Sequence, residues 1–96
     1  MKVPRKIKAC GAEYKVCFHR NLCGDKGQPL FGQADVNKYI INLEYGMDQQ
    51  KKQEVVLHEI LHIIDFNKGF NLGEKGVNNL TLELIQVIRD NKIKIS

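Results

Sequence analysis

The sequence lacks any long uninterrupted hydrophobic run. No segment reaches the roughly 18 apolar residues that a membrane-spanning helix needs. The N-terminal MKVPRKIKAC is also too polar to contain the apolar core of a signal peptide. These two absences predict a cytoplasmic protein with no membrane segment.

Cysteine is scarce, and the cysteines present form no recognisable framework. Cys10, Cys17 and Cys23 are an odd number at spacings that match neither a disulfide pattern nor a CxxC metal-binding knuckle. We therefore interpret them as reduced thiols that mostly fill the core.

No arginine-rich or aromatic-rich motif accompanies the one cluster of basic residues. The net charge is +4, and Lys2, Arg5, Lys6 and Lys8 crowd near the N-terminus. Nucleic-acid surfaces usually combine clustered basic residues with aromatic stacking partners. We therefore interpret the cluster as a solvated edge and expect no nucleic-acid partner.

What the sequence does contain is typical of an ordinary globular domain. Its 96 residues are 43% hydrophobic and 27% charged, which suits a folded chain with one modest core. We predict a single domain over residues 1–96, with strands in residues 1–45 and helices in residues 46–96.

The hydrophobic period is two in the first half of the chain. Apolar residues alternate from Ile7 to Phe18 around a turn at Gly11-Ala12, which predicts a hairpin. Residues 19–29 are rich in turn formers and predict an irregular loop. The runs LFGQADV and YIINL, separated by Asn37-Lys38, predict a second hairpin. The expected sheet is small and antiparallel, with about four strands.

The period becomes helical in the second half. Asp48 is a suitable N-cap for a helix that continues to about Phe66, before a stop signal at Lys68-Gly69. A second helix is predicted from Gly73 to about Asn91, because apolar residues recur there at steps of three and four. The predicted fold class is therefore α+β, a small antiparallel sheet followed by two helices.

The stretch VVLHEILHII in the first predicted helix carries three ionisable side chains among aliphatic ones. His58 and His62 are one helical turn apart, so both imidazoles leave the same face. Burying them together with Glu59 costs on the order of several kcal/mol unless each group is paired or binds a metal. Zinc accepts neutral imidazole nitrogens. HExxH is the zinc-binding pattern of metallopeptidases, in which the Glu is the general base.

The motif predicts hydrolytic chemistry. Chance explains it poorly, since this chain's content of three His and six Glu in 96 residues gives roughly 0.006 expected matches. Zn²⁺ held by His58, His62 and a third protein ligand would keep one position for water and polarise a substrate carbonyl. Glu59 would take the water's proton and pass it to the leaving amine. We predict hydrolysis of a peptide bond in a peptide or protein substrate.

Three carboxylates compete for the third metal position. Glu83 is predicted to point to solvent. Asp65 shares a helix face with the histidines but would strain a tetrahedral site, so it better suits a supporting role, accepting the other N–H of His62. Glu74 is on the core-facing side of the second helix and could be the ligand. However, Asn71 and Glu74 also have the spacing of a capping box, in which Glu74 would only close the helix start.

HEILH, the acidic residue that follows it and the segment VNNLTLELIQVIRDN resemble small HExxH proteins of phages and prophages, within the zincin-like metallopeptidases. Over roughly Phe31 to Asn91 the chain is also similar to the ImmA/IrrE-like peptidases. This resemblance implies that Glu74, just before Val77-Asn78, is the third zinc ligand. The sequence departs from that family at Gly76, often acidic there, and at Val77, usually Ala.

The resemblance further implies that strands precede the HExxH helix and that residues Phe31 to Leu43 hold an extended substrate beside the cleft. It implies a regulatory protein, such as a prophage or stress repressor, as the substrate. By their chemistry, Tyr39, Tyr45 and His19 are candidates to stabilise the oxyanion.

A second hypothesis is a zinc site whose fourth position is closed. The chain would then be a non-catalytic, zinc-stabilised interaction module or a degenerate peptidase, in contact with nucleic acid through its basic N-terminus. Glu59 separates the hypotheses, because a structural zinc site has no use for a base beside its first ligand.

Overall fold

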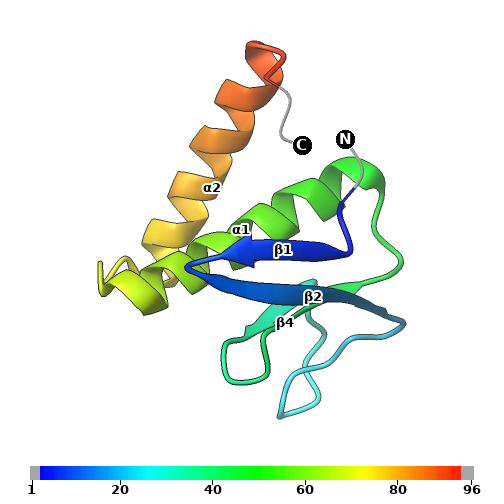
Figure 1. The fold of residues 1–96 in the computed structure, drawn as a ribbon. Coiled ribbons are helices and arrows are strands. Elements are labelled where there is room, and N and C mark those ends of the chain that lie inside the picture. Colours follow the sequence, from blue (N-terminus) through cyan, green and yellow to red (C-terminus); the bar gives the residue numbers. More distant parts are fainter. Residues whose placement is uncertain (1–2, 94–96) are drawn as a thin grey trace.

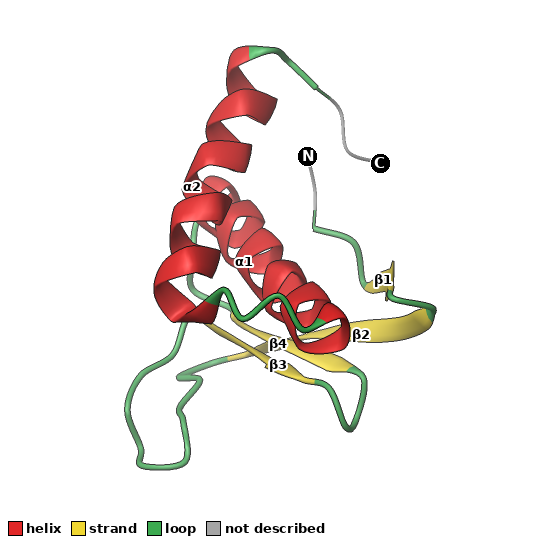
Figure 2. Cartoon of the chain, turned by 90° about the vertical axis from the view of Figure 1, so that its left-hand side faces the viewer, coloured by secondary structure: helices red, strands yellow, loops and turns green. Residues whose placement is uncertain are grey.

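The computed structural model of the chain describes residues 3–93. The elements are β1 (Lys6–Ala9), β2 (Ala12–His19), β3 (Gly32–Asp35), β4 (Ile40–Glu44), α1 (Gln49–Lys68) and α2 (Gly73–Asp90). Both helices lie on the same side of the sheet (Figures 1 and 2), and of these elements α2 contacts α1 alone. The predicted α+β fold is confirmed. Neither described helix has the length and apolar character of a membrane span.

The sheet is mixed, so the prediction of a purely antiparallel sheet is wrong. Both predicted hairpins are present, but the strand order is β1-β2-β4-β3, and β2 pairs in parallel with β4. The cause lies in β4, whose Ile41 and Leu43 are fully buried. This apolar strand takes a central position, and the chain reaches it after first placing the more polar β3 at the edge.

The two hairpin turns differ in detail from the predicted ones. The first turn is Cys10-Gly11, one residue earlier than expected, and both residues have positive φ, 50° and 78°, as a tight two-residue hairpin requires. The second turn spans residues 36–39. The Asp35 carboxylate accepts hydrogen bonds from the N–H groups of Asn37 and Lys38, each at 3.1 Å, which is a usual way for Asp to stabilise a turn.

The main core lies between the sheet and α1. Its buried members come from β2, β4 and α1, and they are Tyr14, Val16, Ile41, Leu43, Val55, Val56 and Ile63. The cysteines do not belong to it. Cys10 and Cys23 are exposed and Cys17 is half-buried, so the prediction that they fill the core is wrong. All three are free thiols, as expected.

The two helices begin differently. Asp48 caps α1 as predicted, since its Oδ1 accepts the N–H of Lys51 at 2.8 Å. The same helix ends at Lys68, two residues beyond Phe66, and its C-cap is the left-handed Gly69 with φ 68°. The N-cap of α2 is Leu72, which makes no side-chain cap. The capping box weighed for Asn71 and Glu74 is therefore not formed.

β3 approaches α1 so closely that Gly32 has no room for a side chain. A Cβ there would lie 2.6 Å from Cγ1 of Val55 and 3.3 Å from Cγ of Glu59. We predict that Gly32→Ala lowers the free energy of unfolding by about 1–3 kcal/mol, because the buried Val55 would have to shift. Urea denaturation followed by circular dichroism measures this change.

Gly46→Ala is the matched control for that variant. A Cβ at Gly46 would meet only Oε2 of Glu44, at 3.6 Å, and the φ of Gly46 lies outside the left-handed region. We expect a change within about 0.5 kcal/mol. Equal losses in the two variants would show that the approach of β3 to α1 is not the cause.

Candidate metal centre

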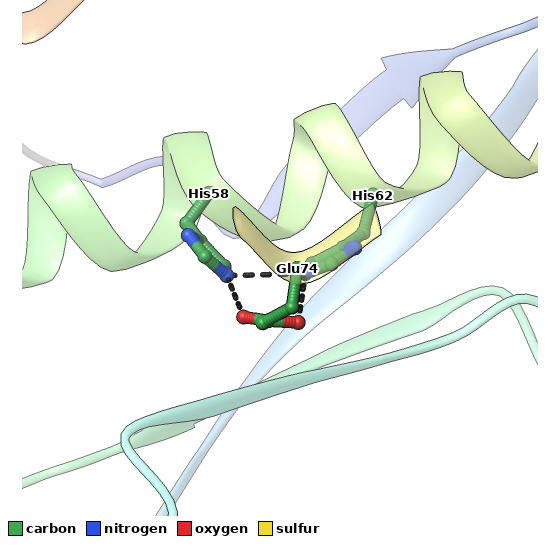
Figure 3. A group of neighbouring side chains, drawn as sticks. All are labelled: His58, His62 and Glu74. Carbon is green, nitrogen blue, oxygen red and sulfur yellow. Dashed lines mark hydrogen bonds and ion pairs between the residues drawn. The ribbon is translucent and has the colours of Figure 1, made fainter. Parts of the chain in front are cut away.

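His58 and His62 point in the same direction from α1 (Figure 3). Their ring centroids are 4.7 Å apart, and their Nε2 atoms are 3.1 Å apart. The side chains are 17% and 28% exposed, so both are largely buried but still reach solvent. The helical spacing of the motif therefore places the two imidazoles together, as predicted.

Glu74 meets the two histidines from the first turn of α2. Its Oε1 lies 2.8 Å from Nε2 of His58, and its Oε2 lies 3.0 Å from Nε2 of His62. One carboxylate thus reaches both rings (Figure 3). Of the two roles weighed for Glu74, the structure shows the contact with the histidines.

Hydrogen bonds alone do not account for these three short contacts. Each Nε2 has one in-plane position, which holds either a hydrogen or a lone pair. With Glu74 ionised, both nitrogens must carry hydrogen to donate to the carboxylate, and the 3.1 Å contact between them then sets two N–H groups against each other. A central cation removes the conflict, because it takes a lone pair from all three side chains. Ligand atoms around tetrahedral zinc lie roughly 3.3 Å apart, close to the observed spacing.

The His58, His62 and Glu74 group could therefore hold a metal ion. One donor atom from each side chain lies within 4.8 Å of the others, and among residues 3–93 no other group of His, Cys, Asp and Glu meets the same condition. Two imidazole nitrogens and a carboxylate oxygen suit Zn²⁺ and similar transition ions, whereas Mg²⁺ and Ca²⁺ prefer all-oxygen sites.

Glu59, between the two histidines in sequence, is buried beside this group, with only 7% of the residue exposed. Burial raises the pKa of its carboxyl group to about 6. The His62 imidazole opposes this rise, the Glu74 carboxylate adds to it, and the backbone N–H of Ala34 opposes it. A carboxylate with a pKa near neutrality is suited to accept and release a proton.

Two hollows meet at the metal group. An open groove of about 910 Å³ is bounded by residues 24–28, β3, the C-terminal half of α1 and Glu74. A smaller hollow of about 260 Å³ lies between β3, α1 and α2. Four residues line both hollows, namely Gly32, His58, Glu59 and Glu74. A molecule that occupied both hollows would therefore pass directly over the metal group and Glu59.

The three oxyanion candidates lie away from this junction. Tyr39 packs edge-on against Tyr14, with 5.5 Å between ring centroids. Tyr45 lies under the guanidinium of Arg20, and Nε2 of His19 is 2.7 Å from Oδ1 of Asn42. None of the three lines either hollow, so the structure brings none of them to the site.

Glu83 and Asp65, the other two carboxylates considered as third ligand, do not belong to the metal group. Glu83 is exposed on α2, as predicted. Asp65 lines the groove, but its Oδ1 accepts the N–H of Leu72 at 3.1 Å. The predicted bond from His62 to Asp65 is not among the hydrogen bonds of the described residues. The N–H groups at the start of a helix lack partners within that helix, and the Asp65 carboxylate accepts one of them, the N–H of Leu72 at the start of α2.

Sequence reasoning missed two parts of the site. Residues 24–28 form a wall of the groove, although the sequence predicted only an irregular loop there. Asn78 lines the smaller hollow, and the resemblance alone had drawn attention to it. Its spacing of four residues from Glu74 was a usable signal, since such residues share a helix face. No local signal connects the loop to the groove.

Comparisons with protein-family models, with curated proteins and with solved structures found no match. The His58, His62 and Glu74 group is consistent with an HExxH-like metal site.

We predict that the chain binds one equivalent of Zn²⁺ and that His58→Ala, His62→Ala and Glu74→Ala each abolish stoichiometric binding, because a mononuclear site cannot replace a lost protein ligand except by water. Metal analysis after dialysis against trace Zn²⁺ measures the content. His19→Ala is the matched control, since His19 bonds to Asn42 outside the group. Loss of zinc from this control as well would contradict the assignment.

Proposed function

We propose that the chain is a zinc-dependent peptidase of the HExxH type, which hydrolyses a peptide bond in a peptide or protein substrate. The observation that carries this proposal is the junction of the two hollows, where the metal group and the buried Glu59 lie together. A site that only stabilised the fold would need neither the open groove nor the buried carboxylate.

Each side chain has a defined role in the proposed reaction. His58 and His62 would hold the ion through neutral nitrogens, and Glu74 would hold it through a carboxylate oxygen. Bound zinc supplies Lewis acidity and lowers the pKa of a coordinated water molecule. Glu59 accepts the proton of the attacking water and delivers it to the leaving amine. A nearby cation favours the ionised form of a carboxyl group, which keeps Glu59 able to accept that proton at neutral pH.

The edge strand β3 is the proposed guide for the substrate. Among residues 3–93 the order β1-β2-β4-β3 leaves one side of β3 without a neighbouring strand, and Gly32 and Ala34 of this strand line the groove. An extended peptide can add to such an edge through backbone hydrogen bonds. The two hollows would then receive substrate residues on either side of the cleaved bond. Of the segment Phe31 to Leu43, only β3 is proposed to hold the substrate, because β4 lies between two other strands.

A regulatory protein, such as a repressor, is the substrate that the ImmA/IrrE resemblance favours, and we retain it as part of the proposal. The alternative is a closed zinc site in an interaction module. It is less well supported, because the metal group faces an open groove and the Glu74 side chain is 75% exposed.

We predict that Glu59→Gln keeps its zinc and loses hydrolysis. The amide is nearly isosteric but cannot take a proton from water, and loss of a general base lowers the rate by about 10²–10⁴-fold. The measurement is mass-spectrometric detection of new termini in a mixture of synthetic peptides, followed by kcat/KM on a peptide that the parent cleaves.

Glu83→Gln is the matched control, because Glu83 is exposed on α2 and lines neither hollow. This variant should cleave like the parent, and 1,10-phenanthroline should stop cleavage by both. If Glu59→Gln cleaves the same peptides at the parental rate, Glu59 is not the base and the peptidase proposal fails.

A further inference from the structure

The connection between α1 and α2 is short and sharply bent. Gly69, Asn71 and Gly73 all have left-handed backbones, with φ values of 68°, 60° and 69°. This conformation suits glycine, and Asn adopts it more readily than most other residues. Contacts from α1 add to this local preference.

Asp65 supplies two such contacts. Its backbone oxygen accepts the N–H of Gly69 at 2.9 Å, and its carboxylate Oδ1 accepts the N–H of Leu72 at 3.1 Å. Leu72 is the N-cap of α2 and provides no side-chain cap itself. A carboxylate on α1 thus satisfies an N–H at the start of α2, where negative charge is also favourable.

The start of α2 matters because Glu74 lies two residues beyond Leu72. The Glu74 side chain is 75% exposed, so surrounding packing does not hold it against the histidines. Val77, which is fully buried, anchors α2 about one turn later. The direction in which the first turn presents Glu74 is therefore set by the bend and by the bond from Leu72 to Asp65.

We propose that Asp65 is a positioning residue of the metal centre, whose carboxylate fixes the start of α2 and so presents Glu74 to His58 and His62 before an ion binds. The inference depends on the proposed metal site but not on peptide hydrolysis. Ligands that are already in place lose less conformational freedom on binding. Removing an outer partner of this kind typically weakens metal binding by about 10–100-fold.

Two substitutions at Asp65 separate positioning from charge. Asp65→Ala removes the acceptor and should weaken Zn²⁺ binding by about 10–100-fold. Asp65→Asn removes the negative charge but keeps a carbonyl oxygen that can accept from Leu72, so it should retain most of the affinity. Competition with a chromophoric chelator measures the affinity, and the visible absorption of bound Co²⁺ reports the ligand set. Equal losses in both variants would overturn the inference, because charge alone would then explain them.

Asp48→Ala is the matched control for a lost helix cap. Asp48 Oδ1 accepts the N–H of Lys51 at 2.8 Å at the start of α1, which is the same type of bond at a helix start that carries no ligand. This variant should unfold at lower urea concentration, as Asp65→Ala should, yet bind Zn²⁺ like the parent. Comparable weakening of Zn²⁺ binding in Asp48→Ala would mean that general loss of stability causes the effect.

A double-mutant cycle tests whether Asp65 acts through Glu74. In a Glu74→Ala background, Asp65→Ala should reduce the residual Zn²⁺ affinity no further. The full loss in that background would overturn the inference. Failure of the parent chain to bind any Zn²⁺ or Co²⁺ would remove the metal centre and this inference together. These binding measurements decide the role of Asp65 whether or not a peptide is cleaved, so failure of the peptidase proposal is distinguishable from failure of this one.

Discussion

A positive charge would stabilise three lone-pair donors that converge on one point. Nε2 of His58, Nε2 of His62 and the Glu74 carboxylate are separated by 2.8–3.1 Å, and two imidazole hydrogens cannot serve three contacts. Glu74 is the residue through which the start of α2 meets the histidines. The proposed role of Glu59 would depend on the same cation, since a buried carboxylate beside a cation stays ionised.

The parts of this site that are local in sequence could be predicted from the sequence. A period of two in residues 7–18 and a helical period after Asp48 located the strands and helices within about two residues of their bounds. The one-turn spacing of His58 and His62 fixed their common face, because helix geometry is the same in every protein. Glu74 was harder. A metal ligand and a capping-box residue were both possible for Glu74 from the sequence. Only the position of the helix start, with Leu72 as N-cap, excludes the capping box.

The parts that depend on tertiary arrangement could not be predicted. Strand order depends on which strand packs most deeply against α1, and adjacent hairpins in the sequence do not specify that β4, with its buried Ile41 and Leu43, lies between β2 and β3. Residues 24–28 line the groove because the sheet topology carries them there. Asp65 lines the same groove as the histidines, but its hydrogen-bond partner depends on the path of residues 69–72, which is set by the packing of α2 against α1.

The candidate metal centre lies between the main core and α2. The main core contains residues of β2, β4 and α1 and none of α2, and α2 contacts α1 alone among the described elements. The two histidines therefore lie on α1, which packs into the main core. Glu74 lies on α2, which among these elements packs only against α1. An ion bound by all three side chains would connect α2 to the main core, and binding that favours one arrangement stabilises that arrangement. Preorganisation by Asp65 and attachment by the ion are then two contributions to the same end, which is to keep the start of α2 over the groove where a substrate would lie.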